Sequence, residues 1–290
     1  MRIAQISDFH LTHLTWNPFR LLSKRILGNL NWLFFRKNQF FEEQINPLPK
    51  LFEELGVDLI LLGGDFSTTS LTEEFKKASR FVKRLSQPWI AVPGNHDHYT
   101  YSSYRQKRFY RYFTNHRKSI SHSVEFFTLK EHGIEAHKMK NGWWTIALDT
   151  AIATNPYSSE GLFSTKLQEY FEEVLKLIPI TATILLLNHY PFFQNDVHRH
   201  NLKRGTELQE ILKRDPRIRL YLHGHTHRQT VADLQVSLLP LVLDSGSCTE
   251  GKKGSWNLID LNEKGCSVST YRWNDKWTNT RTEEFLWTRK

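Results

Sequence analysis

The 290-residue chain is poor in cysteine, and this limits the metal sites it can form. Cys248 and Cys266 are its only cysteines, and they do not have the spacing of a zinc-binding pair. The sequence therefore excludes a structural zinc site built from thiolates. Two free thiols agree with a reducing compartment, and we assign them no catalytic part.

Long apolar runs are also missing. The longest uninterrupted stretches span four or five residues, such as 59–62 and 184–187, whereas a membrane-spanning helix needs roughly 20. We expect no such helix. We also expect no cleaved signal peptide, because removing the usual ~15–30 residues would take Asp8 and His10 away. The expected location is the cytoplasm.

The composition is that of an ordinary globular protein, with 39% hydrophobic and 24% charged residues. Neither internal repeats nor low-complexity linkers divide it. The motifs described below run through most of the chain, so we expect one domain over residues 1–273. Residues 274–290 mix charges with Trp277, Phe285 and Trp287, which predicts a docked C-terminal tail.

Five short apolar runs, each typical of a buried strand, are followed closely by polar residues that can bind metal. The runs and the groups that follow them are 3–6 with Asp8 and His10, 57–62 with Asp65, 89–92 with Asn95 and His96, 184–187 with His189, and 218–222 with His225 and His227. Helical spacing between the early strands indicates alternating strands and helices. In open α/β sheets, sites assemble beyond the carboxyl ends of strands, so these groups are predicted to converge.

Imidazole together with carboxylate and amide oxygen suits divalent Mn, Fe, Zn or Co, and among these we expect Mn²⁺. Two such ions held about 3.5–4 Å apart activate water and stabilise both oxygens of an in-line displacement at phosphorus. Each motif alone has a plainer explanation: Gly64-Asp65 can be only a turn, and His189 can be a core histidine. Taken together and in this order, the motifs predict a two-metal phosphoesterase.

The ordered series resembles the calcineurin-like metallophosphoesterase family, whose pattern is Asp-x-His, Gly-Asp, Gly-Asn-His-Asp/Glu, His and Gly-His-x-His. The resemblance implies an α/β fold of two packed mixed β-sheets flanked by helices, a four-layer αββα sandwich. It also implies a role for each residue. Asp8, His10 and His227 would hold one metal, Asn95, His189 and His225 the other, and Asp65 would bridge them.

His96 would stay off the metals in this family, and would stabilise charge on phosphorus or protonate the leaving oxygen. Hydroxide would attack phosphorus directly, without a phospho-enzyme. The neighbouring His223, Asp97 and His98 are not ligands in the family pattern, so packing or turn roles are expected for them. The same holds for Asp149 and Asp244.

An insertion spans residues 14–46, and its part from 14 to 41 contains five basic residues and no acidic residue. At helical spacing its apolar residues share one face and Arg20, Lys24, Arg25 and Arg36 share the other. This pattern predicts a basic amphipathic helix lying on an anionic membrane surface, at the inner face of the membrane. The alternative is a helix packed on its own domain. The predicted membrane-contacting residues are Phe19, Leu22, Ile26, Leu30, Trp32 and Leu33.

A second insertion, residues 99–140, interleaves aromatic and basic residues directly after His96 and is expected to form a cap. Arginine binds phosphate through two parallel hydrogen bonds, so Arg105, Arg108 and Arg111 are predicted to bind substrate. The alternative is a charged surface helix that only borders the cleft.

Both insertions favour a lipid-linked nucleotide substrate, since within the family such features resemble enzymes acting on lipid-linked phosphate compounds. UDP-2,3-diacylglucosamine, cleaved to UMP and a lipid sugar 1-phosphate, is the expected example. The shorter pyrophosphatase for that substrate differs here, because it has Arg at the position of His96.

Four alternatives remain open at this stage. A soluble phosphodiesterase acting on cyclic nucleotides or glycerophosphodiesters ranks second, a nuclease third, and a protein phosphatase last among the enzymes. A metal-free scaffold would have lost ligands that are all present here. We expect no stable protein partner.

Overall fold

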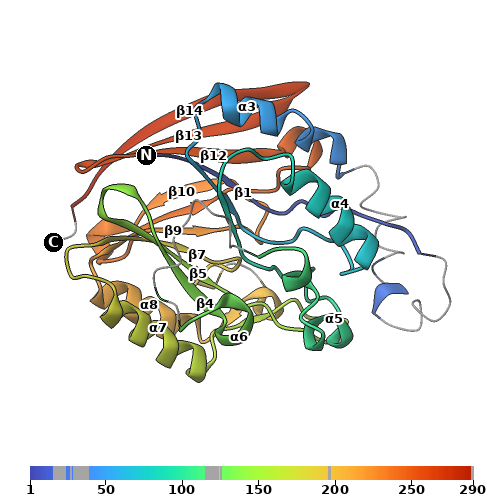
Figure 1. Cartoon of the computed structure of the whole chain (residues 1–290), viewed down its shortest axis with the longest axis horizontal. Helices are drawn as coiled ribbons and strands as arrows, with labels where there is room; N and C mark the ends of the chain where they lie inside the picture. The colour runs from blue at the N-terminus through green and yellow to red at the C-terminus, as the bar shows by residue number, and fades with distance from the viewer. Residues whose placement is uncertain are drawn as a thin grey trace.

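The fold is known from a computed structural model, which describes residues 1–15, 24–26, 28, 39–114, 124, 126–194 and 197–288. Two six-stranded sheets lie face to face, and helices cover their outer sides (Figure 1). The strand order is β14-β13-β12-β1-β2-β3 in the first sheet and β10-β11-β9-β7-β5-β4 in the second.

The first sheet consists of β1 (Arg2–Ile6), β2 (Leu59–Leu62), β3 (Trp89–Ala91), β12 (Ser255–Leu261), β13 (Gly265–Asn274) and β14 (Lys276–Leu286). The second consists of β4 (Ile134–Lys138), β5 (Trp143–Leu148), β7 (Thr183–Leu187), β9 (Ile218–His223), β10 (Thr230–Asp233) and β11 (Leu241–Asp244). A two-stranded ribbon pairs β6 (Gly161–Leu162) with β8 (Leu202–Lys203).

The α-helices are α3 (Leu48–Glu54), α4 (Thr72–Val82), α5 (Tyr101–Arg105), α6 (Leu129–His132), α7 (Thr165–Leu177) and α8 (Gly205–Arg214). Short 3-10 turns occupy Glu42–Ile45, Phe109–Arg111, Lys140–Gly142, His198–His200, Gln235–Ser237 and Gly251–Lys253.

Continuous apolar runs form the central strands because these strands are buried on both faces. In β7, Leu185 and Leu187 belong to the core that includes the first sheet, whereas Ile184 and Leu186 belong to the core beneath α7 and α8. Figure 1 shows α7 and α8 on the outer side of the second sheet and α3 outside the first. The predicted fold class, two mixed sheets flanked by helices, is confirmed.

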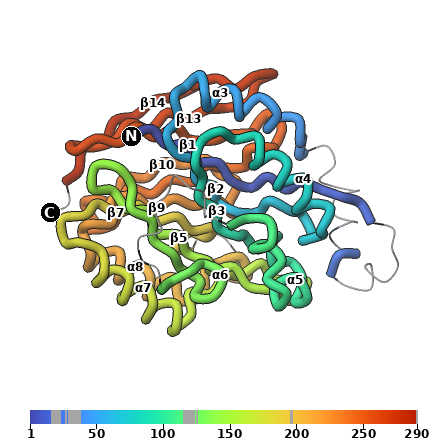
Figure 2. Tube along the Cα trace, in the orientation of Figure 1, coloured from blue at the N-terminus to red at the C-terminus, as the bar shows by residue number. Residues whose placement is uncertain are grey.

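Parallel pairing sets the direction of the strands that lead into the site. β1 pairs in parallel with β2, and β2 with β3, and Figure 2 shows these three strands next to one another. β5, β7, β9 and β11 also run parallel to one another. Because parallel strands end at the same edge, the residues after β1, β2 and β3 gather together, and so do those after β7 and β9.

The sequence of α7 explains why this segment is helical. Ser164 accepts a hydrogen bond from the Leu167 amide at 3.1 Å and so caps the first turn. Leu167, Phe171 and Val174 then recur at helical spacing and are buried against the second sheet.

The segment 99–140 and the C-terminal segment both contribute strands. β4, inside the expected cap, pairs antiparallel with β5 and is an edge of the second sheet. Residues 276–286, inside the expected tail, form β14 and pair antiparallel with β13. The expected boundary at residue 273 therefore falls within the β13–β14 hairpin.

Only part of the basic insertion is described. Arg25, expected on the basic face of this helix, is buried and donates hydrogen bonds to the carbonyls of Thr69 and Ser70 at 3.1 and 3.3 Å. Ile26, expected to contact the membrane, is 46% exposed. The other five predicted membrane residues, Phe19, Leu22, Leu30, Trp32 and Leu33, lie outside the described residues. Within the described part of the chain, we find no helix that has both the length and the apolar character to cross a membrane.

Candidate active site

All seven predicted metal ligands lie on turns that follow strands of the two sheets, and backbone hydrogen bonds join these turns. The Asp8 amide donates to the Gly64 carbonyl at 3.0 Å, and the Gly224 amide donates to the His189 carbonyl at 3.1 Å. The first bond links the turns after β1 and β2, and the second links those after β7 and β9. Rigid strands thus hold side chains that are distant in sequence.

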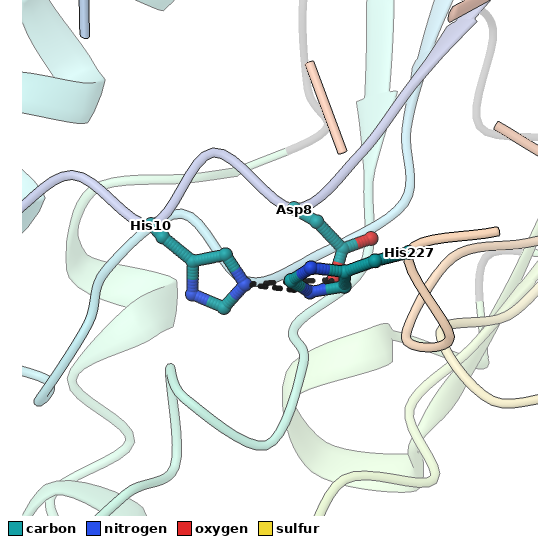
Figure 3. Close-up of side chains that lie close together, drawn as sticks. All are labelled: Asp8, His10 and His227. Carbon is teal, nitrogen blue, oxygen red and sulfur yellow. Dashed lines mark hydrogen bonds and ion pairs between the residues drawn. The ribbon is translucent and has the colours of Figure 1, made fainter. Parts of the chain in front are cut away.

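The first group of donors is Asp8, His10 and His227, shown in Figure 3. His10 Nε2 lies 2.9 Å from His227 Nε2, and Asp8 Oδ1 lies 3.2 Å from His227 Nε2 and 3.8 Å from His10 Nε2. Ligands bound to one ion at about 2.0–2.2 Å are roughly 3–3.5 Å apart, so these separations suit a shared cation.

The second group is Asn95, His189 and His225. Asn95 Oδ1 lies 3.2 Å from His189 Nε2 and 3.0 Å from His225 Nδ1. Asp65 lies between the two groups, because its Oδ2 is 3.5 Å from His189 Nε2 and 3.8 Å from His10 Nε2. This position suits the bridging role that the family resemblance implies for Asp65.

Outer hydrogen bonds determine which nitrogen each imidazole presents to the site. His189 Nδ1 donates to the Gly63 carbonyl at 2.7 Å, and His225 Nε2 donates to the His200 carbonyl at 2.8 Å. His227 Nδ1 lies 3.3 Å from the Glu250 carboxylate. In the neutral rings the inward nitrogens therefore carry lone pairs, which is the arrangement of metal-binding histidines.

The backbone is strained at five of the seven predicted ligands. Asp8, His10, Asp65, His225 and His227 have φ between +44° and +70°. Residues other than glycine rarely adopt this backbone region. Those that do cluster at functional sites, where the surrounding structure enforces the conformation.

Two glycines allow the turns to approach one another. A Cβ atom on Gly94 would lie 2.2 Å from Asp65 Oδ1, and one on Gly224 would lie 2.3 Å from Asp8 Oδ2. The glycines of both motifs are therefore required so that backbone can pass directly beside the carboxylates.

Charge in the site favours a bound cation. Burial opposes protonation of His227 and His189, but the charge of Asp8 raises the pKa of His227 to about 10, and the charge of Asp65 raises that of His189 to about 9. Burial alone would raise the pKa of Asp65, because it disfavours the charged carboxylate. His189 and His96 nevertheless hold the pKa of Asp65 well below its usual value. The carboxylate charges therefore keep protons on His227 and His189, and divalent ions would displace these protons on binding.

His225 is the exception among these histidines, because burial lowers its pKa to about 3. It is therefore neutral, the form that binds a metal. Taken together, the donor set, the separations and the tautomers fit two divalent ions. When bound, such ions supply a hydroxide at neutral pH and stabilise charge on phosphorus.

His96 lies beside His10 and Asp65. One of its ring nitrogens lies within 4.8 Å of donor atoms of His10 and Asp65, and its amide donates to Asp65 Oδ1 at 2.8 Å. Its Nδ1 donates to the Thr68 carbonyl at 2.6 Å. Nε2 is therefore the nitrogen that can exchange a proton with a substrate.

A cleft of about 770 Å³ lies over these side chains. Its described lining includes Asp65, Asn95, His96, His225 and His227 from the predicted site. Tyr99, Lys24, Arg199, His200 and the loop around Tyr157 also line it. A volume of this order accommodates a nucleotide-sized molecule.

The three arginines predicted to bind substrate are not among the described residues lining this cleft. Arg105 lines a separate cavity of about 340 Å³, Arg108 donates to the Ser70 carbonyl at 2.8 Å, and Arg111 is exposed on a 3-10 turn. The chain turns away from the cleft after Tyr99, so closeness in sequence did not mean closeness in space.

Two neighbours of the ligands have the structural roles expected of them. Asp97 is buried and accepts hydrogen bonds from the amides of Phe66, Ser67 and Gly94, which fixes the turn that carries Asn95 and His96. His98 is buried and lies 3.3 Å from Asp149 Oδ2.

Sequence reasoning missed several residues at the site. Glu250 contacts His227, the His200 carbonyl orients His225, and Arg199 and Tyr157 line the cleft. Glu250 and Tyr157 lie on loops, and Arg199 and His200 on a 3-10 turn, all outside the strand-end motifs. Their sequence neighbourhoods carry no spacing that would have marked them.

The fold and the site together define a metal-dependent phosphoester hydrolase. The chain belongs to the calcineurin-like phosphoesterase family, whose model matches residues 1–229.

Named relatives share a quarter of the sequence. The chain is 24% identical to the 3′,5′-cyclic adenosine monophosphate phosphodiesterase CpdA of Escherichia coli, over 87% of this chain and 78% of that protein. It is 25% identical to a 3′,5′-cyclic-nucleotide phosphodiesterase of Nostoc, over 78% and 71%. A probable glycerophosphodiester phosphodiesterase of Arcobacter nitrofigilis is 27% identical over 59% of this chain and 57% of that protein.

Among solved structures, a dimetal phosphatase from Danio rerio superimposes with a TM-score of 0.69. The alignment covers 99% of both chains at 12% identity. This likeness supports the four-layer fold.

Proposed function

We propose that the protein is a phosphodiesterase that hydrolyses 3′,5′-cyclic nucleotides. The observation that carries this proposal is the likeness to cyclic-nucleotide phosphodiesterases over most of the chain, combined with the cleft above an intact set of metal ligands. Glycerophosphodiesters are the second candidate substrates, because one relative bears that name.

The relatives give less support to the lipid-linked diphosphate expected from the sequence. The curated relatives named above are described as acting on cyclic nucleotides or glycerophosphodiesters, not on lipid diphosphates. The arginines invoked for that substrate also lie outside the cleft. Cyclic nucleotides therefore replace UDP-2,3-diacylglucosamine as our first choice.

In the proposed reaction the protein's side chains position the phosphodiester and donate one proton to the leaving oxygen. Asp8, His10 and His227 would hold one ion, and Asn95, His189 and His225 would hold the other. Asp65 links the two groups, and we expect Mn²⁺ to support the highest activity, as the mixed nitrogen and oxygen donors suit it.

His96 acts at the leaving oxygen. Its Nδ1 is fixed by the Thr68 carbonyl, so Nε2 faces the cleft and can give a proton to the 3′ oxygen as the bond to phosphorus breaks. Replacing His96 by Asn should lower kcat by about 10²–10⁴-fold and leave the metal content unchanged. Loss of metal in this variant would show that His96 is a ligand instead.

The test is a comparison of substrates with chelator-treated protein reloaded with Mn²⁺. Hydrolysis of cyclic AMP should exceed that of glycerophosphoethanolamine and of UDP-2,3-diacylglucosamine. An Asp65→Asn variant, folded but inactive, would assign the activity to this site. A wild-type preparation that cleaves bis(p-nitrophenyl) phosphate but no cyclic nucleotide would refute the proposal.

A further inference from the structure

The rim of the cleft carries an aromatic side chain that packing within the protein does not explain. Tyr157 lines the cleft and is 77% exposed. Large aromatic side chains bury considerable area when they find a partner, so an exposed one on a cleft wall is available to a ligand.

The backbone that carries Tyr157 is nevertheless held in place. The Tyr157 amide donates to Asn155 Oδ1 at 3.0 Å, and the Ser158 hydroxyl donates to the Arg199 carbonyl at 3.3 Å. The Ser159 amide also donates to the Arg199 carbonyl, at 3.0 Å. Because hydrogen bonds already hold this loop, little further conformational entropy is lost when a flat ligand stacks on the exposed ring.

Lys24 joins this loop to the catalytic side of the cleft. Its Nζ donates to Thr154 Oγ1 at 3.1 Å and to the Ser158 carbonyl at 3.2 Å. The same Nζ lies 4.6 Å from the centre of the Tyr99 ring, which stacks on His96 with ring centres 5.6 Å apart. Lys24 therefore connects the loop of Tyr157 to the pair formed by Tyr99 and His96.

The charge of the cleft is one-sided. Its described lining contains the cations of Lys24 and Arg199, and Asp65 is the acidic residue there. Asp65 belongs to the metal-binding groups, so the rim is positive and aromatic. This combination suits the electron-rich face of a nucleobase and the acceptor atoms at its edge.

We propose that Tyr157 forms a nucleobase subsite, in which the base stacks on its ring while the phosphodiester reaches the metal-binding groups. Lys24 is a positioning residue that holds the Tyr157 loop against the catalytic side. This inference rests on the proposed function and names what would make nucleotides better substrates than glycerophosphodiesters. Since stacking is tolerant of base identity, adenine and guanine nucleotides should bind with similar affinity.

The first test compares KM for cyclic AMP with KM for glycerophosphoethanolamine, which lacks a base. Replacing Tyr157 by Ala should raise the KM for cyclic AMP relative to that for the base-free diester by about 5- to 150-fold, the range of one lost stacking contact. Tyr157→Phe should keep the wild-type ratio because it keeps the ring. Tyr101→Ala is the matched control, since Tyr101 is also exposed but lies on α5, outside the cleft lining.

A double variant tests the role of Lys24. Lys24→Met removes both hydrogen bonds to the loop, so it should raise the KM for cyclic AMP more than the KM for glycerophosphoethanolamine. If Lys24 acts through Tyr157, Lys24→Met should add little to Tyr157→Ala. Fully additive effects would overturn the positioning role, and an unchanged KM ratio in Tyr157→Ala would overturn the subsite.

A binding experiment separates this inference from the proposed function. Calorimetry can compare 5′-AMP with ribose 5-phosphate, which share the phosphate and the sugar but not the base. Wild-type protein should bind 5′-AMP about 5- to 150-fold more tightly, and Tyr157→Ala should remove most of that difference. This outcome would support the subsite even if cyclic nucleotides are not hydrolysed. Equal affinities of wild-type protein for 5′-AMP and ribose 5-phosphate would refute the subsite, even if cyclic nucleotides are hydrolysed.

Discussion

Glu250 should tune the metal bound by Asp8, His10 and His227, although it binds no metal itself. Its Oε2 lies 3.3 Å from His227 Nδ1, which directs the other ring nitrogen at the metal-binding group. Removing an outer partner of a metal-binding histidine typically costs 10–100-fold in metal affinity, which is about 1.4–2.7 kcal/mol. Glu250→Ala loses both the charge and the acceptor, so the full effect is expected there, and a smaller one in Glu250→Gln.

The structure also predicts which of the two metal-binding groups is affected. His189 and His225 are oriented by the carbonyls of Gly63 and His200, so Glu250→Ala should leave the second group unchanged. Calorimetric titration of Mn²⁺ into chelator-treated protein should then show one weakened binding step and one of wild-type affinity. Glu263→Ala, in the exposed turn between β12 and β13, is the control. Two unchanged steps, or two equally weakened ones, would refute the reasoning.

Three further predictions follow from single contacts. Gly94→Ala places Cβ 2.2 Å from Asp65 Oδ1, so Asp65 must move. Activity should fall by about 100-fold, and the metal content should be reduced. A wild-type metal content would contradict this prediction. Trp277→Ala on β14 removes a buried ring and its hydrogen bond to the Gln44 carbonyl. Urea unfolding should therefore show that the free energy of unfolding falls by about 3–5 kcal/mol. A fall below about 1 kcal/mol would mean that β14 is not docked. Burial raises the pKa of Glu74 to about 7, against its ordinary 4.5, so its contribution to stability is present below pH 4.5 and is lost as the pH rises through 7. With chelator present, Glu74→Gln should therefore gain roughly 3 kcal/mol relative to wild type between pH 4.5 and 8 in urea unfolding, and parallel curves for the two proteins would contradict the shift.

The metal-binding groups could be anticipated from the sequence because local rules place them. Each predicted ligand follows an apolar run, and such runs become strands buried on both faces. Parallel pairing of β1 with β2 then brings Asp8 and Asp65 to one edge without any further information. The order of the motifs was sufficient to predict the ligands, because in both sheets parallel strands carry them on the turns that follow.

The walls of the cleft could not be anticipated in the same way. Arg105, Arg108 and Arg111 follow His96 closely, yet the chain leaves the cleft after Tyr99 and returns to the second sheet through β4. The residues that do line the rim, such as Tyr157 and Arg199, come from loops joined by hydrogen bonds between distant segments. Loop positions depend on such contacts, which leave no periodic signal in a sequence.

The C-terminal strand illustrates a different limit. Residues 276–286 mix threonine and charged residues with Trp277 and Phe285, and we predicted a docked tail from them. They form β14, at the edge of the first sheet, where charged side chains on the open side discourage pairing with other chains. An edge strand keeps few buried positions, so its sequence resembles that of a tail.

The arrangement of the ligands explains why metal binding should also stabilise the fold. Asp8 and Asp65 come from turns of the first sheet, and His189 and His225 from turns of the second, so two shared ions would join the sheets at one edge. Without a cation, the donor atoms lie 2.9 to 3.8 Å apart with protons shared between them, and five ligands keep backbone angles that cost energy. A ligand that binds only the folded state adds RT ln(1 + [L]/Kd), or about 2.7 kcal/mol at one hundred times Kd. The strain at the ligands is therefore tolerated because the core between the sheets enforces it, and the bound ions would repay part of that cost.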